Sequence, residues 1–166
     1  GSGVDKNALS HTVFHVLLGT QLIPEVRVVS TSGKYDLLPA NRDLAGAEVE
    51  MVDLSEREAR LKSAVQNVTN EYDYILMDCP PALNLLTLNG LCTAHAIIIP
   101  MQCEYFALEG LSDLVNTIKK VRVNFNPSLR IEGLLRTMFD PRNILSQQVS
   151  DQLLQHFGDK VYRTAI

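Results

Sequence analysis

The stretch YDYILMDCPP, residues 72–81, predicts the end of a buried strand followed by a stiff turn. Its apolar residues 75–77 run directly into Asp78, and Pro80 and Pro81 follow one residue later. Proline has no backbone N–H and fixes φ, so sheet pairing stops at these positions. Ligands of open parallel sheets bind beyond the carboxyl ends of the strands, where Asp78 would lie. From this pattern alone, a metal-orienting carboxylate and an aspartate that only caps a turn are equally good interpretations.

Amphipathic segments on both sides of this stretch predict helices. Residues 107–125 carry apolar side chains at helical spacing along one face. Gly19 fits a C-cap for the first helix, and Ser55 with Glu58 has the pattern of a capping box at the start of another. The predicted helices are residues 7–19, 44–52, 55–68, 83–94, 107–125 and 146–157.

Near-continuous apolar runs alternate with these helices. They predict strands at residues 35–40, 72–78, 94–100, 129–139 and 160–166. Apolar strands separated by helices are typical of a parallel sheet that is covered on both faces. The predicted fold class is therefore α/β, a doubly wound and mainly parallel sheet with helices on both faces, in a single domain that spans residues 1–166.

Composition and charge restrict the class of protein. The 166 residues carry a formal net charge of −4, which argues against a generally basic nucleic-acid binder but allows a local basic patch. No apolar run approaches the roughly 20 residues of a membrane span, and the first residues lack the pattern of a signal peptide. Cys79, Cys92 and Cys103 are spaced too widely for a CxxC motif and fit reduced thiols. We therefore expect a cytoplasmic protein.

Four stretches of the sequence resemble the ParA/Soj family of chromosome and plasmid partitioning ATPases, which are relatives of MinD with a deviant Walker A motif. The stretches are LAGAEVEMV (residues 44–52), YDYILMDCPPALNLLTLNGL (72–91), IIIPMQCEYFALEGLSDLVNTI (97–118) and IEGLLRTMFDPRNILSQQV (131–149). The second and third are highly specific. The resemblance implies a P-loop NTPase-like fold, truncated here at both ends, and makes ATP and Mg²⁺ the ligands of the intact parent protein.

The resemblance also gives the opening stretch a role. It implies that Asp78 is the Walker B aspartate, which holds Mg²⁺ through water. It further implies that Cys79, Pro80 and Pro81 begin the switch segment that senses the γ-phosphate. The strand would then end so that one carboxylate faces the metal and the next residues form a rigid turn that responds to the nucleotide.

Base and DNA contacts are implied near the end of the chain. By resemblance, Thr137 and Met138 border the adenine, although a methionine at a strand end also fits a core position. Arg142 matches a family arginine that is linked to non-specific DNA binding, and Arg163 is a further candidate on the same basic face. Such contacts would be to phosphates, hence independent of sequence and sensitive to salt. The alternative for a loop arginine such as Arg142 is a solvated side chain without a partner.

Two segments of the family pattern have no counterpart in these 166 residues. Nothing fits G-x-x-x-x-G-K-[ST], the phosphate loop that the family writes as KGGVGKT, and the DPQGN segment is also absent. We therefore expect this chain to be the central part of a ParA-type ATPase domain. By itself it should be inactive, while its parent is an ATP hydrolase.

The resemblance implies a cycle for the parent protein. ATP would join two subunits into a homodimer, the dimer would bind DNA non-specifically over the nucleoid, and a ParB-type partner would stimulate hydrolysis and release. Two alternatives stay open: a non-catalytic binding module, and a MinD-like membrane-cycling ATPase, which needs a C-terminal amphipathic helix. The stretch QCEYFALEGL, residues 102–111, favours the partition branch without a membrane. The sequence leaves chromosome and plasmid roles equally open.

Overall fold

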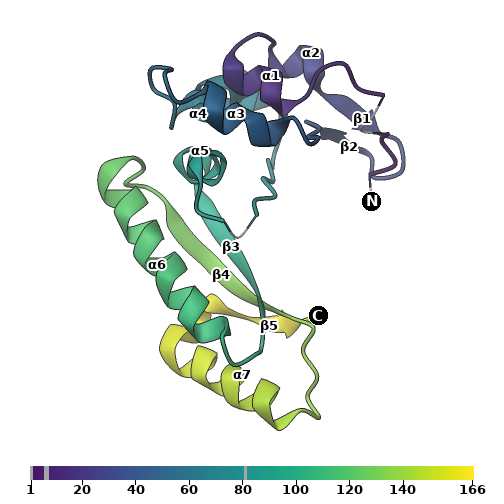
Figure 1. Ribbon diagram of the computed structural model, residues 1–166. Helices are drawn as coiled ribbons and strands as arrows, with labels where there is room; N and C mark the ends of the chain where they lie inside the picture. Colours follow the sequence, from purple (N-terminus) through teal and green to yellow (C-terminus); the bar gives the residue numbers. More distant parts are fainter. Residues whose placement is uncertain (1, 6–7, 81) are drawn as a thin grey trace. The chain divides into compact units, whose positions relative to one another are not determined.

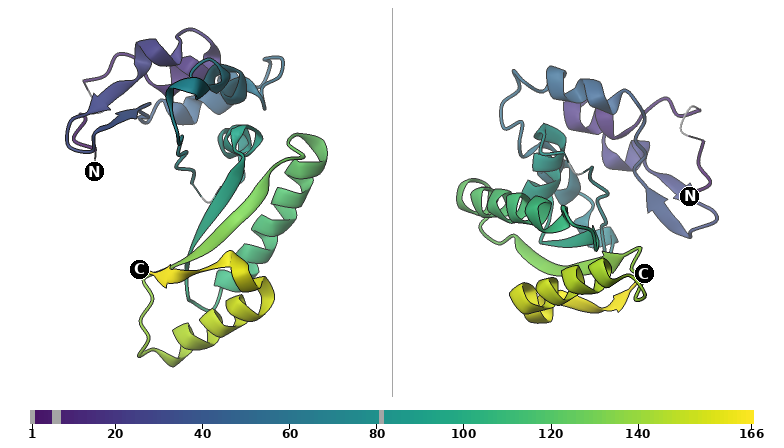
Figure 2. Two further views of the ribbon diagram at one scale, coloured as in Figure 1. Left: turned by 180° about the vertical axis from the view of Figure 1, so that it is seen from behind. Right: turned by 60° about the horizontal axis from the view of Figure 1, so that its bottom comes forward.

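The computed structural model describes residues 2–5, 8–80 and 82–166. Its contacts divide the chain into two compact units, residues 1–93 and 94–166, each with its own buried side chains. Figures 1 and 2 show short helices and a small hairpin in the first unit, and a sheet with two longer helices in the second. The single domain expected from the sequence stays a prediction.

The regular secondary structure of the first unit consists mainly of short helices. The elements are α1 (Val13–Leu18), α2 (Ile23–Val26), β1 (Val28–Ser30), β2 (Tyr35–Leu37), α3 (Leu44–Glu50), α4 (Arg60–Gln66), the 3₁₀ turn η1 (Thr69–Glu71) and α5 (Leu85–Thr93). Leu17 of α1 packs with Ala47 of α3 and with Met51, and all three are buried. A second buried cluster consists of Val16, Ile23, Val26 and Val68. These two clusters form most of the buried apolar core of the first unit.

The ends of two helices test the predicted caps. Gly19 follows α1 with φ of 77°, the left-handed conformation that favours glycine, so the predicted C-cap is confirmed. The capping box at Ser55 is wrong, because α4 begins five residues later, at Arg60. The Glu58 carboxylate accepts a hydrogen bond from Arg57 at 3.0 Å instead. Near the start of α4, the Leu61 N–H donates to the side chain of Asn89, a residue of α5 that the local pattern does not reveal.

The strand predicted at residues 72–78 is wrong for this structure. Residues 72–80 form neither helix nor strand, and Figure 1 draws them as a plain thread. Tyr74 and Leu76 are 87% and 88% exposed. A strand requires a neighbouring strand that pairs with its backbone. In the described part of the first unit β1 and β2 pair only with each other, so residues 72–78 have no such neighbour. Residues 35–40 do begin with a strand, β2, although it ends at Leu37, before Pro39.

The second unit is a parallel sheet with crossover helices. Its elements are β3 (Ala96–Gln102), α6 (Ala107–Asn124), β4 (Arg130–Thr137), α7 (Ile144–Phe157), the 3₁₀ turn η2 (Gly158–Lys160) and β5 (Val161–Ala165). The central strand, β4, is parallel to both β3 and β5. Helix α6 joins β3 to β4, and α7 joins β4 to β5, so the unit consists of two consecutive βαβ units. The three predicted strands and their parallel arrangement are confirmed.

Buried and exposed side chains alternate along most of β3, whereas β4 has two consecutive buried residues, Gly133 and Leu134. Ile99 of β3 is 5% exposed, whereas its neighbour Ile98 is 51% exposed, because successive side chains of a strand point to opposite faces. The buried apolar residues of the two helices are Leu111, Ile118 and Val121 on α6, and Val149 and Leu153 on α7. Among the described residues, no helix has the length and apolar character that a membrane span requires.

Candidate functional site

The Asp78 carboxylate is exposed and has no protein partner. It forms no hydrogen bond or ion pair with any residue that the structure describes, and it lies at the end of residues 72–78. An unpaired carboxylate in water is a suitable ligand for a hard cation such as Mg²⁺, directly or through water. Among the described residues, no group of three or more His, Cys, Asp or Glu could hold a metal ion. A Mg²⁺ ion held by Asp78 would therefore not be enclosed by a cluster of such side chains from the described part of the chain.

The thiol of Cys79 lies against α5. A Cβ atom added to Gly90 would come within 3.0 Å of the Cys79 Sγ atom. Burial of the sulfur, and then the neighbouring Asp78 carboxylate, raise the pKa of the Cys79 thiol. The thiol is therefore protonated at neutral pH and serves as a packing group rather than as a nucleophile.

The far side of the turn is also attached to α5. Thr87 Oγ1 donates a hydrogen bond to the Ala82 carbonyl at 2.6 Å, and the Thr87 N–H donates to Asn84 Oδ1 at 3.0 Å. Pro80, which lies between Cys79 and Ala82 in the sequence, is exposed. Pro81, predicted to belong to the same switch segment, lies outside the described residues.

The predicted base contacts lie at the carboxyl end of β4, in the second unit. Thr137 is the last residue of β4 and pairs with Gln102, the last residue of β3. Met138 follows with φ of 53°, and it is 79% exposed. A side chain so exposed is not part of the core, which removes that alternative for Met138. Contact with a nucleotide base stays a prediction for both Thr137 and Met138.

Arg136 is an organising residue that the sequence analysis missed. Its Nη1 donates to Ser150 Oγ of α7 at 2.9 Å, and its Nη2 donates to the carbonyls of Tyr162 and Arg163 in β5, each at 3.1 Å. Its guanidinium also lies 5.4 Å from the centre of the Phe139 ring. One side chain of β4 thus joins the helix and the strand that follow it. The available signal was a single arginine inside the apolar run IEGLLRTMF.

The two predicted DNA contacts, Arg142 and Arg163, are both exposed. The Arg142 side chain is 89% exposed and forms a two-pronged ion pair with Asp140, with Nε–Oδ1 and Nη2–Oδ2 distances of 3.1 Å. Asp140 Oδ1 also accepts the backbone N–H of Arg142 at 2.9 Å. These bonds hold the pKa of the Asp140 carboxyl below its ordinary value, the side-chain bond more than the backbone bond. Arg142 is therefore accessible to solvent, but two of its guanidinium nitrogens already bind the Asp140 carboxylate.

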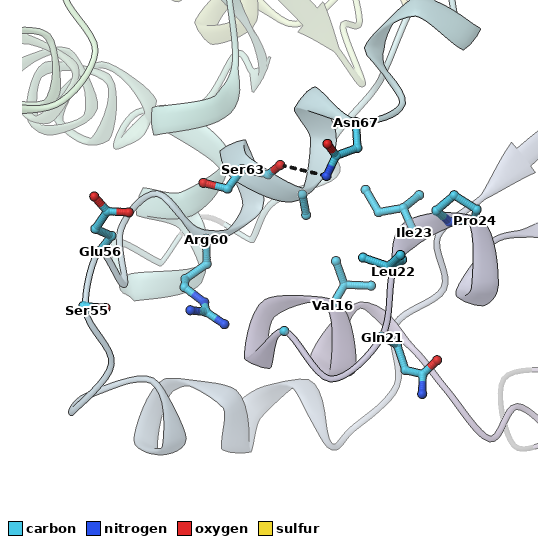
Figure 3. Close-up of a pocket in the computed structure, with 12 residues that line it drawn as sticks. Val16, Gln21, Leu22, Ile23, Pro24, Ser55, Glu56, Arg60, Ser63 and Asn67 are labelled. Carbon is cyan, nitrogen blue, oxygen red and sulfur yellow. Dashed lines mark hydrogen bonds between the residues drawn. The ribbon is translucent and has the colours of Figure 1, made fainter.

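The first unit has a cavity that none of the predicted site residues line. It has a volume of about 370 Å³ and lies between α4 and the segment that joins α1 to α2 (Figure 3). One wall is apolar and the other is polar. The apolar residues include Val16, Leu22, Ile23 and Pro24, and the polar ones include Arg60, Ser63 and Asn67. Arg60 Nε donates to the Leu17 carbonyl at 2.8 Å, so this guanidinium binds the backbone near the end of α1.

Comparison with known proteins decides the family. A family model described as "AAA domain" matches residues 1–131. The sporulation initiation inhibitor protein Soj of Bacillus subtilis strain 168 is 44% identical over 166 residues, covering all of this chain and 66% of Soj. The chromosome partitioning protein ParA of Caulobacter vibrioides strain NA1000 is 42% identical over 168 residues, covering all of this chain and 63% of ParA. The chain belongs to the ParA/Soj family.

Solved structures share the fold of this family member. Cobyrinic acid a,c-diamide synthase from Mycobacterium smegmatis, with bound ATP analogue and magnesium, has a TM-score of 0.87 and 38% identity, covering 94% of this chain and 64% of that one. A plasmid partition protein from Borrelia burgdorferi has a TM-score of 0.76 and 25% identity, covering 96% of this chain and 64% of that one. The predicted α/β, P-loop NTPase-like fold class is therefore confirmed. The chain spans about two thirds of the length of these relatives.

Proposed function

We propose that the full-length protein, meaning this chain with any sequence that precedes or follows it, is a ParA-type ATPase that segregates chromosomes or plasmids. Membership of the ParA/Soj family supports this general role. The observation that carries the proposal is the free carboxylate of Asp78, which is followed by a turn held against α5. ATP and Mg²⁺ are the ligands, and Asp78 holds the metal through water while Cys79, Pro80 and Pro81 respond to the γ-phosphate.

The proposed cycle uses the second unit for the base and for DNA. ATP binding joins two copies of the chain, and Thr137 and Met138 border the adenine. Arg142 and Arg163 contact DNA phosphates without sequence preference, in the cytoplasm at the nucleoid and without a membrane. The exposed guanidinium of Arg142 supports this role. A ParB-type partner then stimulates hydrolysis and releases the DNA.

These 166 residues hydrolyse no ATP by themselves in this proposal. No segment of the chain has the G-x-x-x-x-G-K-[ST] pattern whose backbone N–H groups and lysine bind phosphates. The same absence favours the second candidate, a binding module that keeps the sheet and the partner surface without nucleotide chemistry.

Phosphate release by the full-length protein, with DNA and its partner present, separates the two candidates. The ATPase proposal expects stimulated turnover that Asp78→Asn abolishes. The exposed Asp113→Asn variant on α6 serves as the matched control and should keep the activity. A wild-type protein without turnover supports the binding module, and an Asp78→Asn variant with normal turnover contradicts the assigned role of Asp78.

A further inference from the structure

We propose that Thr87 and Gly90, three residues apart on α5, hold the turn after Asp78 and thereby set the position of its carboxylate. This inference rests on the proposed function of Asp78 as the metal-orienting residue. Residues at i and i+3 lie on the same face of a helix, so one face of α5 contacts the turn on both sides. We call Thr87 and Gly90 the α5 clamp.

Thr87 supplies the polar half of the clamp. The residue is buried, and its hydroxyl has one hydrogen bond across to the turn, the 2.6 Å bond to the Ala82 carbonyl. Because Thr87 is buried, a hydroxyl that loses the Ala82 carbonyl has little water to replace it, so the donor favours the clamped position. The Asn84 side chain caps the Thr87 N–H and fixes the start of the helix from which the hydroxyl reaches.

Gly90 supplies the steric half. It is a buried residue inside a helix, and its backbone requires no left-handed conformation. Glycine within a helix is less favourable than alanine, so its presence needs another physical reason. The Cys79 sulfur provides one, since a Cβ atom at position 90 would meet it at 3.0 Å. The absent methyl group leaves the space that the thiol occupies.

The contact with the Cys79 sulfur lies next to the site residue. Cys79 follows Asp78 directly, and Pro80 restricts the backbone between Cys79 and the Ala82 contact. A displacement of the sulfur or of the Ala82 carbonyl therefore moves Asp78. We assign Thr87 and Gly90 as positioning residues, since neither contacts a ligand itself.

The three cysteines of the chain offer a direct measurement of the clamp. Cys79 is exposed overall, but its sulfur packs against Gly90 of α5. Cys92 and Cys103 are buried. The alkylation rate of each thiol, followed by mass spectrometry of peptides from the folded chain, reports how accessible and how ionised it is. Thr87→Val and Gly90→Ala should each speed alkylation of Cys79 several-fold, with Cys92 and Cys103 unchanged. Thr87→Ser, which keeps the hydroxyl, should react like the wild type.

Two results of the alkylation experiment would overturn the clamp. One is an unchanged rate at Cys79 in both Thr87→Val and Gly90→Ala. The other is an equal rise at all three thiols in both variants, which would mean that α5 supports the whole unit rather than the turn.

The Mg²⁺ dependence of ATP binding by the full-length protein tests the link to Asp78. Thr87→Val and Gly90→Ala should raise the Mg²⁺ concentration for half-maximal binding several-fold, with little change in ATP affinity when Mg²⁺ is absent. If Asp78→Asn shifts this dependence but the clamp variants do not, the clamp is refuted and the proposed function stands. If Asp78→Asn has no effect while the alkylation results hold, the clamp stands as a feature of the turn and the proposed role of Asp78 fails.

Discussion

The side-chain oxygen of Asn89 accepts a hydrogen bond from the backbone N–H of Leu61 at 3.0 Å, which joins α5 to the first turn of α4. The amide nitrogen of the same side chain donates to the carbonyls of Arg57 at 2.8 Å and Leu85 at 3.0 Å. Asn89 is 1% exposed, so a buried amide has all of these bonds inside the protein. Asn89 therefore supplies a side-chain acceptor near the start of α4, the role that the sequence pattern assigns to Ser55.

Replacement of Asn89 by alanine should destabilise the first unit. The change removes a buried amide and leaves one partly buried N–H and two carbonyls without this partner, and we expect the free energy of unfolding to fall by about 3 kcal/mol. Urea denaturation of the chain measures the change. Asn124→Ala is the control, because Asn124 is exposed and its side chain bonds only within α6, to the Lys120 carbonyl. Equal stabilities of the two variants would refute the structural role of Asn89.

Replacement of Arg136 by lysine should destabilise the second unit although it conserves the charge. Lysine cannot reproduce a planar fork that reaches Ser150, Tyr162 and Arg163 together, and we expect a loss of about 2 kcal/mol. Hydrogen exchange of the amides in β5 and α7 would locate the effect. Arg130→Lys is the matched control, since Arg130 is exposed and, among the described residues, its side chain forms an ion pair only with Glu132. Unchanged protection of these amides in Arg136→Lys would contradict a stabilising role of the Arg136 contacts.

The ion pair of Asp140 and Arg142 predicts a pH dependence. The pKa of Asp140 is below its ordinary value of 3.8, so the folded state binds a proton there less readily than the unfolded state. The pair therefore stabilises the fold above pH 3.8, and this contribution is lost as the pH falls from 3.8 through the lower folded pKa. Carboxyl chemical shifts in an NMR titration give this pKa directly. Arg142→Ala should return it to the ordinary range, and an unchanged titration would mean that the pair does not persist in solution.

Arg142 should matter for DNA in a manner that does not depend on sequence. If it contacts one phosphate, Arg142→Ala weakens binding by the full-length protein equally on unrelated duplexes, and the slope of log K against log salt falls by about 1. Fluorescence anisotropy over a range of salt concentrations measures both effects. Arg122→Ala, an exposed cation in the last turn of α6, is the control. A loss of affinity that differs between duplexes would contradict a pure phosphate contact.

The sequence predicts the second unit well because its signals are local. Apolar runs at 94–100 and 129–139 and the amphipathic face of residues 107–125 each indicate one element, and β3, β4 and α6 follow them closely. Residues 72–78 have the same apolar pattern but no paired neighbour, so pattern alone does not make them a strand. Asn89 and Arg136 were missed because their partners lie up to 32 and 27 positions away in the sequence. The local pattern singles out Asp78, whereas the assigned roles of Asp78 and Arg142 come from the family resemblance, which carries spatial information that composition and periodicity lack.

The most direct test of the central claim is the binding of Mg²⁺-ATP to the full-length protein, measured by calorimetry with and without Asp78→Asn. If the Asp78 carboxylate orients the metal, the variant should lose at least about tenfold in affinity when Mg²⁺ is present and little when it is absent. The Asp113→Asn control should bind like the wild type. Equal affinities of the wild type and Asp78→Asn in saturating Mg²⁺ would contradict the account.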